Sequence, residues 1–142
     1  KNYTFNLDSI RDPNVKYPNQ KKNGKYRCNP LGKNPGDVWE ISKVTTGTDR
    51  SSKERTGHPS QFPLRIVENI IKVSSNPTDI VFDPFAGSFS SGITAYAFGR
   101  VFIGSEISEK YCEMAVNRFL EFEKAKKTHT QQLLLLSSLS FY

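Results

Sequence analysis

Two acidic side chains and a loop of small residues are the groups in this sequence best suited to bind a ligand. Asp83 ends the short apolar run 79–83, and the small-residue loop 84–88 follows it before a segment with helical spacing. This order predicts strand, loop and helix, which places backbone N–H groups and a carboxylate at the carboxyl edge of a sheet, where open α/β sheets bind their ligands. Glu106 ends the next predicted strand, 23 positions after Asp83 (83 to 106), where an acid would meet a ribose diol.

The loop has the spacing of a dinucleotide fingerprint, except that Phe89 stands in place of the middle glycine of the segment 87–92. That glycine lets the backbone approach a pyrophosphate, so Phe89 argues against NAD or FAD. A nucleoside ligand without a diphosphate points to S-adenosylmethionine. On spacing alone, an ordinary βα turn whose small residues serve only packing remains the alternative.

The elements that must position these residues lie between 58 and 124. Four apolar residues at helical spacing, followed by Asn76-Pro77, predict a first helix: Leu64, Val67, Ile70 and Ile71. The further predicted elements are a strand at 80–83, a helix near 90–98, a second buried strand at 101–104 and a helix from Ser108. This helix-β-α-β-α order predicts an α/β fold with two parallel neighbouring strands and a right-handed crossover, a partial Rossmann-like sheet. Because two strands alone make no stable doubly wound sheet, further strands must come from the N-terminal part or from another chain.

Outside this half the sequence shows little periodicity. Residues 1–57 form a basic, loop-rich segment with many turn signals, and only 37–44 alternates as a short edge strand would. The polar stretch 45–57 is expected to be a mobile loop. Residues 125–142 are expected to be a flexible tail, although its leucine run 133–136 leaves a docking segment as an alternative.

The net charge of the 142 residues is +6 and the pI is about 9.4, with much of the excess between Lys16 and Lys33. A basic stretch that also carries Tyr17 and Tyr26 suits a phosphate backbone, and a merely solvated basic surface is the alternative. The candidate DNA-binding residues are Lys21, Lys22, Lys25 and Arg27.

The two cysteines, Cys28 and Cys112, lie far apart and in no metal-ligand spacing, so we expect no metal site and two free thiols of a reducing compartment. No apolar run approaches 18 residues and no signal peptide is evident, so we expect no membrane association. These features favour a cytoplasmic protein.

Four segments, in order, resemble those of DNA amino-methyltransferases, which methylate N6 of adenine or N4 of cytosine. They are residues 32–39 (GKNPGDVW), 58–63 (HPSQFP), 81–88 (VFDPFAGS) and 99–106 (GRVFIGSE), the last followed by Tyr111, Ala115 and Arg118. The resemblance covers roughly residues 1–120. It departs from the family at Phe89-Ser90-Ser91, where Gly-Thr-Thr is commoner, which leaves the start of the helix in doubt.

The resemblance implies that S-adenosylmethionine is the cofactor, that double-stranded DNA is the substrate and that the cell is prokaryotic. The loop 85–88 would cradle the cofactor near Asp83, Glu106 would take the ribose hydroxyls and Ile107 would lie against the adenine. The segment 58–63 would close over the methionine end, although His58 alone could simply cap a helix or fill a turn. The implied cofactor-binding residues are His58, Pro59, Gln61, Asp83, Pro84, Phe85, Ala86, Gly87, Ser88, Glu106 and Ile107.

The catalytic motif of such enzymes is not evident in this sequence. They grip an extruded base with Asp, Asn or Ser before two prolines and an aromatic residue, but no two of the eight prolines here are adjacent. We therefore expect no catalytic residue in this chain. In one permutation of the family the catalytic motif comes first and the cofactor segments last, so this chain resembles the cofactor-binding part, completed by a second chain or by an N-terminal region.

Two other readings stay open at this point. The chain could be a non-catalytic remnant of a truncated methyltransferase that binds S-adenosylmethionine or nucleic acid, which the leucine-rich tail mildly favours. Alternatively, its basic segment could simply bind DNA, with affinity that falls steeply with salt and does not depend on a cofactor.

Overall fold

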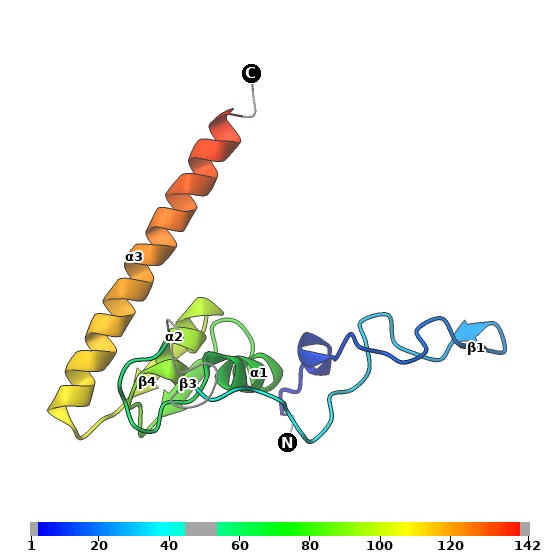
Figure 1. The fold of residues 1–142 in the computed structure, drawn as a ribbon, viewed down its shortest axis with the longest axis horizontal. Coiled ribbons are helices and arrows are strands. Elements are labelled where there is room, and N and C mark those ends of the chain that lie inside the picture. The colour runs from blue at the N-terminus through cyan, green and yellow to red at the C-terminus, as the bar shows by residue number, and fades with distance from the viewer. Residues whose placement is uncertain (1–2, 45–53, 140–142) are drawn as a thin grey trace.

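The structure, a computed structural model, describes residues 3–44 and 54–139 (Figure 1). Its elements are η1 (Leu7–Ile10), β1 (Lys21–Lys22), β2 (Lys25–Tyr26), α1 (Leu64–Ser74), β3 (Ile80–Asp83), α2 (Ser90–Ala97), β4 (Val101–Gly104) and α3 (Glu109–Leu139). The predicted helix-β-α-β-α order is therefore confirmed. Figure 1 shows a body of α1, α2, β3 and β4, from which the β1–β2 hairpin and the far end of α3 extend in different directions.

The sheet of the body has two parallel strands, as predicted. Ile80 of β3 pairs with Val101 of β4, and the register runs to Asp83 opposite Gly104. The β1–β2 hairpin forms a separate antiparallel pair, so within the described ranges no further strand joins β3 and β4. The described residues of the N-terminal part thus do not supply the strands that a complete sheet requires.

Helix α1 is held at both ends by side chains from outside it. The carboxylate of Glu54 accepts a hydrogen bond from the Leu64 N–H at 3.0 Å, in the first turn. At the other end, the Asn6 side-chain amide donates to the carbonyl oxygens of Lys72 and Ser75. Such caps satisfy backbone groups that a helix end leaves unpaired.

Packing between α2 and α3 is aromatic. The Tyr96 ring lies edge-on to Phe119 at 5.1 Å and to Phe122 at 6.3 Å between centroids. The Tyr96 hydroxyl donates to the Glu123 carboxylate, and this bond, with desolvation, raises the pKa of Tyr96. Helix α3 is thereby fixed to the body through its N-terminal half.

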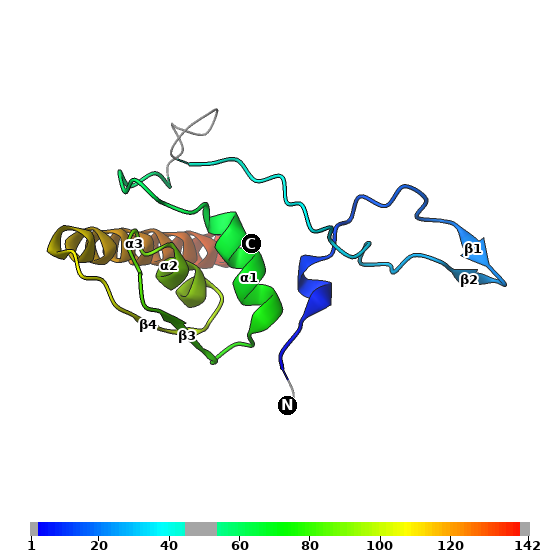
Figure 2. The same cartoon turned by 90° about the horizontal axis from the view of Figure 1, so that it is seen from below.

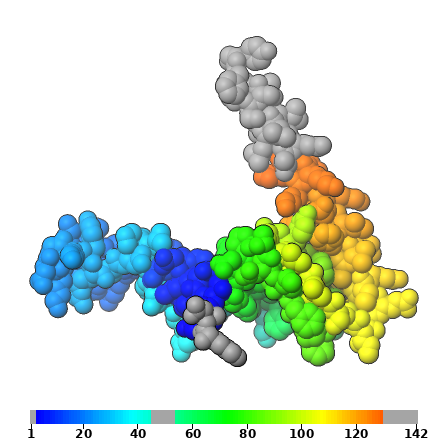
Figure 3. All heavy atoms as spheres, turned by 180° about the vertical axis from the view of Figure 1, so that it is seen from behind, coloured from blue at the N-terminus to red at the C-terminus, as the bar shows by residue number. Residues whose placement is uncertain are grey.

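The buried apolar core is small. Among the described residues the buried hydrophobic side chains are Val44, Ile71, Ile93 and Ala95. The accessible surface is 11106 Å², against about 7,400 Å² for a compact monomer of this mass. Figure 3 shows the same elongated outline, with the N-terminal segment standing away from the body.

Two predictions outside the body are wrong. The segment 37–44 forms no strand, because no neighbouring strand lies beside it, and Val38 is 77% exposed. Helix α3 continues to Leu139, so residues 125–139 are helical rather than a flexible tail. That stretch contains neither Gly nor Pro, and its Lys, Ala, Gln and Leu residues favour helix without an amphipathic pattern. The expected mobile loop 45–57 lies outside the described residues from 45 to 53.

The prediction that the strand at 101–104 is buried is wrong on one of its faces. Val101 and Ile103 are each about half exposed, whereas Phe102 between them is turned toward the helices. The uncovered face results from the absence of helices on that side of the sheet.

In the described part of the chain, no helix is sufficiently long and apolar to cross a bilayer.

Candidate functional site

A hollow of about 310 Å³ lies beside the carboxyl end of β3. Several predicted site residues line it together with residues that the sequence did not single out. The lining residues are His58, Ser60, Phe62, Val67, Asp83, Phe85, Ala86, Gly87, Ser88, Ser90 and Ser91. Residues from the segment 58–63 and from the loop after β3, which lie more than 20 positions apart, thus share one cavity.

The loop after β3 turns sharply at two residues with positive φ. Gly87 has φ +48°, and a Cβ there would lie 3.2 Å from Nε2 of His58. Phe89 has φ +65°, and its ring packs edge-on against Phe102 at 5.0 Å and Phe119 at 6.0 Å. The Phe89 side chain therefore faces the packed body rather than the hollow.

Asp83 fixes the start of this loop. One carboxylate oxygen accepts the Phe85 N–H at 3.0 Å, and the other accepts the hydroxyl of Ser91 in the first turn of α2. The sequence did not identify Ser91 as a site residue. Its signal was only its position in the first helical turn after the loop.

Glu106 fixes the other side of the loop. Its carboxylate accepts the N–H of Gly87 at 2.9 Å and the N–H of Ser108 at 2.9 Å. The bond from the Ser108 N–H lowers the pKa of Glu106 most; burial opposes this effect, and the bonds from the Gly87 and Ile107 N–H groups lower the pKa further. A carboxylate is therefore in place at the end of β4, and the fully exposed Ile107 side chain follows it.

His58 stands over the loop from the segment before α1. Its Nδ1 accepts the Ser60 N–H at 3.1 Å, which leaves the proton of the neutral ring on Nε2, the atom nearest Gly87. The ring packs against Tyr111 of α3 with centroids 4.3 Å apart. His58 thereby joins the loop to the start of α3.

Five predicted site residues do not line the hollow: Pro59, Gln61, Pro84, Glu106 and Ile107. Of these, Gln61 is fully engaged elsewhere. It is buried, its carbonyl oxygen accepts from the N–H and hydroxyl of Thr56, and its amide donates to the Glu54 carbonyl at 2.5 Å. The structure does not bring Gln61 into the lining of the hollow. Pro59 is exposed and Pro84 accepts the Ser105 hydroxyl through its carbonyl at 2.8 Å, both outside the lining.

Arg118 of α3 connects the two segments that form the hollow. Its guanidinium donates to the Ser88 carbonyl at 2.6 Å, to the Ser90 hydroxyl at 3.1 Å and to the Glu54 carbonyl at 3.4 Å. Burial lowers the pKa of Arg118, and the charge of Glu54 opposes this effect. The sequence could not show this role, because the partners lie 28 to 64 positions away from Arg118.

The candidate DNA-binding residues lie on and beside the β1–β2 hairpin, at the end of the molecule away from the hollow (Figures 1 and 2). The hairpin turns at Asn23-Gly24, both with positive φ, a pair that favours tight hairpin turns. Lys22 is paired with Lys25 across the hairpin, and Lys21 lies 4.6 Å from the centroid of the Tyr26 ring. Lysine side chains are thus presented on both faces of a narrow ribbon.

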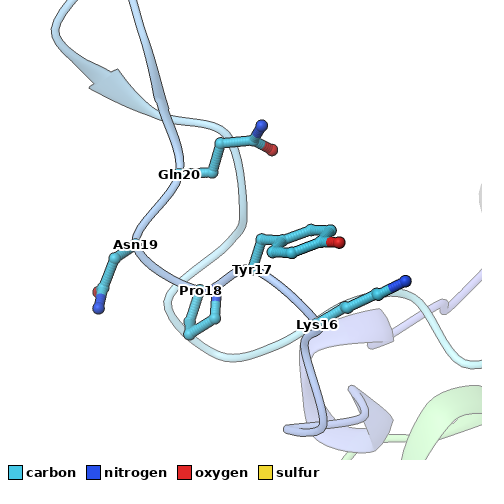
Figure 4. Close-up of a pocket in the computed structure, with 5 residues that line it drawn as sticks. All are labelled: Lys16, Tyr17, Pro18, Asn19 and Gln20. Carbon is cyan, nitrogen blue, oxygen red and sulfur yellow. The ribbon is translucent and has the colours of Figure 1, made fainter.

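The loop before the hairpin forms a second, separate cavity of about 380 Å³, which residues 16–20 line. Figure 4 shows the side chains of Lys16, Tyr17 and Gln20 on one side of this loop and Asn19 on the other. The Lys16 ammonium lies 5.4 Å from the Tyr17 ring centroid. The side-chain carbonyl of Gln20 accepts a hydrogen bond from the Arg27 guanidinium at 3.3 Å. This loop therefore adds cationic and aromatic groups to the hairpin.

Comparison with known proteins gives consistent matches. A family model described as DNA methylase matches residues 1–117. The type II methyltransferase M.ScaI of Streptomyces caespitosus is 58% identical over 117 residues, which are 82% of this chain and 38% of that protein. The DNA adenine methyltransferase YhdJ of Escherichia coli is 42% identical over an alignment that covers 99% of this chain and 50% of that protein.

Among solved structures, the cytosine-N4-specific PvuII DNA methyltransferase superposes with a TM-score of 0.50 at 27% identity. The match covers 60% of this chain and 32% of that one. The chain thus spans half or less of the length of each of these relatives.

Proposed function

The chain belongs to the DNA methylase family of amino-methyltransferases, and on that premise we propose that residues 58–124 form its S-adenosylmethionine-binding half. The enzyme would methylate N6 of adenine or N4 of cytosine in double-stranded DNA. The observation that carries the proposal is the bond from the Gly87 N–H to the Glu106 carboxylate beside the hollow that Asp83 and His58 line. The carboxylates of Asp83 and Glu106 thus both bind one glycine-containing loop at the carboxyl edge of the sheet.

Each side chain then has a chemical task toward the cofactor. The negative charge of Asp83 would favour the cationic methionine end, and the remaining lone pairs of Glu106 would accept the ribose hydroxyls. The exposed Ile107 offers an apolar surface for the adenine. The cofactor, when bound, supplies the methyl group. The proposed cofactor position lies between two segments, Pro84 to Ser88 and His58 to Pro63. Pro59 and Gln61 would shape the second segment.

No residue of this chain is proposed as a general base. The target amine is a weak nucleophile, because its lone pair is delocalised into the ring, and it needs hydrogen-bond acceptors and a stacking ring to present it to the methyl group. We propose that the complementary part of the methyltransferase supplies these groups through a Pro-Pro-aromatic motif, as a second chain or as another region of the same protein.

Lys21, Lys22, Lys25 and Arg27 are proposed to contact DNA phosphates. Phosphate contacts of this kind position a protein on the duplex without reading its sequence. In a bacterium this substrate lies in the cytoplasm, where we propose that the protein acts.

Calorimetric titration of the 142-residue chain with S-adenosylmethionine tests the cofactor proposal. We expect saturable binding that Asp83→Ala and Glu106→Ala each weaken. Asp79→Asn is the matched control, because Asp79 stands just before the opposite end of β3 and its carboxylate binds Asn76 N–H. Normal binding by both Asp83→Ala and Glu106→Ala would show that the assignment of this loop is wrong.

The two-part proposal is tested by assaying methyl transfer to DNA with and without a partner that bears the Pro-Pro-aromatic motif. We expect transfer only in the mixture. Full activity of this chain alone would contradict the proposal. Cofactor binding without transfer in any mixture would instead identify a non-catalytic remnant.

A further inference from the structure

Helix α3 has a face that contacts the body and a face that does not. The contacting face carries Tyr111, Arg118, Phe119 and Phe122. On the other side six exposed residues follow one another at helical spacing, and we call them the outer stripe: Glu109, Glu113, Val116, Leu120, Lys124 and Lys127. At about 100° per residue, these positions lie within roughly 80° of one another around the helix axis. Figure 1 shows α3 extending beyond the body, and the stripe is exposed along its whole length.

The outer stripe is apolar in its middle and oppositely charged at its two ends. Val116 and Leu120 are 58% and 50% exposed and lie four residues apart on the helix, so their side chains are neighbours. Two glutamates precede them and two lysines follow them. Lys127 lies 3.7 Å from Glu123, an exposed pair of the kind that contributes little to stability. The stripe therefore offers an apolar centre between an acidic and a basic end.

We propose that the outer stripe pairs with the outer stripe of a second copy of this chain, with the two α3 helices antiparallel. In a twofold symmetric pair, a residue that contacts a second position of its partner is itself contacted at that position. Glu109 and Lys127 are each nine positions from residue 118 (109 to 118 and 118 to 127), so a twofold axis there brings them together. Val116 and Leu120, each two positions from residue 118, meet by the same symmetry.

Charge identifies the occupant as a second copy and sets its direction. An antiparallel copy places its basic end on the acidic end of the stripe, and Glu113 then lies near Lys124 of that copy. A parallel copy would place like charges together at both ends. DNA would be repelled by the two glutamates, and a uniformly charged partner helix would match only one end. The stripe is thus complementary to itself in one orientation.

A hollow in the acidic half of the stripe provides room for a side chain of the second copy. Its volume is about 480 Å³, and its lining residues are Glu109, Cys112, Glu113, Val116 and Asn117. Because Val116 meets Leu120 of the second copy, that leucine lies at this hollow. The body contacts of α3 lie on the opposite side of the helix, so the pairing leaves the hollow beside Asp83 open. The inference goes beyond the proposed function, since it requires neither cofactor nor DNA.

The interface is small. Two apolar side chains per copy, flanked by solvent-exposed ion pairs, bury less than the about 800 Å² per partner of a standard stable interface. We therefore expect a reversible dimer with a micromolar dissociation constant. Salt should weaken it, because exposed charge pairs are screened.

Sedimentation equilibrium of the 142-residue chain over a micromolar to millimolar concentration series measures this dissociation constant. Leu120→Glu puts a carboxylate into the apolar centre, and we expect it to weaken the dimer at least about tenfold. All substituted positions are exposed, so the variants should fold, and far-ultraviolet circular dichroism checks that they do. A chain that stays monomeric throughout the series, or a dimer that Leu120→Glu does not weaken, overturns the proposal.

Charge reversal tests the antiparallel direction. Glu113→Lys and Lys124→Glu each place like charges opposite one another, so each should weaken the dimer. The double variant restores opposite charges and should restore the dissociation constant. Glu121→Lys is the matched control for Glu113→Lys, because Glu121 is exposed but turned about 100° away from Leu120. Failure of the double variant to recover, or an equal effect of Glu121→Lys, would contradict the pairing.

Cofactor binding separates this inference from the proposed function. Monomeric Leu120→Glu protein should bind S-adenosylmethionine as the parent does, measured by calorimetry. A parent chain that dimerises as described but binds no cofactor supports the pairing and contradicts the function. A chain that binds the cofactor but stays monomeric does the reverse.

Discussion

The body around the hollow and the basic arm, residues 11–44, are built by different means. In the body, hydrogen bonds join residues far apart in the chain, such as Gly87 with Glu106 and Ser88 with Arg118. The arm is held by turns and by bonds between its own residues, such as the Asn23-Gly24 turn and the pairing of Asp12 with Lys33. We infer that the body binds through geometry that depends on packing, whereas the arm binds through charge. Changes at the hollow of the body should therefore alter stability and cofactor binding together, and changes in the arm should alter DNA binding alone.

The largest expected effect is that of Arg118→Met, which removes the guanidinium between the two segments of the hollow. It leaves the carbonyl oxygens of Ser88 and Glu54 without this donor, which should lower the free energy of unfolding by about 2–4 kcal/mol. We also expect loss of cofactor affinity beyond the loss of folded protein, measured by calorimetry at a temperature where both proteins are folded.

Arg100→Met is the matched control. Arg100 also donates to backbone carbonyls, those of Ser75 and Phe98, but at the end of the sheet away from the hollow. It should destabilise the fold to a similar extent and leave the cofactor affinity of the folded protein unchanged. Equal effects of the two substitutions on affinity would show that Arg118 is merely structural.

Gly92→Ala is expected to have the next largest effect. A Cβ at this position would lie 2.3 Å from the Phe89 ring, which is itself enclosed by Phe102 and Phe119. Overpacking of this kind costs about 1–3 kcal/mol, which outweighs a gain of up to about 1 kcal/mol in helix propensity. Thermal unfolding measures the difference.

Gly24→Ala gives the contrast within the arm. Gly24 has φ +77° and no atom within 4 Å of the added Cβ, so the substitution strains only the hairpin turn. The melting of the body should not change. Stabilisation by Gly92→Ala would show that the Phe89 ring moves freely, against the packing described here.

The sequence allowed the body to be predicted better than the arm, and the reason is periodicity. Leu64 to Ile71 and the runs at 80–83 and 101–104 repeat apolar residues at the spacings of helix and strand, and those elements are present. The alternation at 37–44 has the same form, but a strand also needs a neighbour, which the pattern does not reveal. Helix α3 continues beyond residue 124 through helix propensity without an apolar stripe, so hydrophobic periodicity does not reveal that part of it.

The candidate site was predicted in part. His58, Asp83 and the loop 85–88 line one hollow because the strand-loop-helix order fixes where they lie. The family resemblance suggested Gln61 as a cofactor residue, but its hydrogen bonds are used by Thr56 and Glu54. The roles of Arg118 and Ser91 depend on tertiary contacts, and the exposure of Val101 and Ile103 depends on the absence of such contacts in the described residues. No local sequence pattern encodes either.

A smaller effect is expected when Lys22 and Lys25 are both replaced by Gln. The two ammonium groups stand opposite each other on the hairpin, an arrangement that repels unless an anion lies nearby. If each contacts one phosphate, the slope of log affinity for DNA against log salt should fall by about 1.8, and cofactor affinity should stay the same. Replacing Lys110 and Lys124 of α3 by Gln changes the net charge by the same amount. This control should retain most of the salt dependence of DNA affinity. Equal slopes for the two double variants would assign DNA binding to overall charge.

The smallest effect concerns two carboxylates with lowered pKa values, one in each region. The pKa of Glu106 lies below its ordinary 4.5, mainly through the Ser108 N–H, and that of Asp12 below 3.8, mainly through the Asn14 N–H. Since both pKa values are lowered in the folded protein, the contribution of each carboxylate to folding stability is complete above the ordinary pKa of its type. That contribution is lost as the pH falls through the pKa of the folded state. Glu106→Gln presents an amide N–H₂ to one of two N–H donors, so it should weaken the body and its cofactor binding at pH 7. The difference from the parent should vanish in acid.

Asp12→Asn should change neither property of the body at pH 7, because the Asp12 side chain binds only within the arm, to Asn14 and Lys33. Thermal unfolding from pH 3 to 7, with calorimetry at pH 7, measures both variants. If Asp12→Asn lowered cofactor affinity as much as Glu106→Gln, the arm and the body would be energetically coupled. The long-range bonds from Asn6 to the end of α1 would then be the path to examine, since they join the start of the chain to the body.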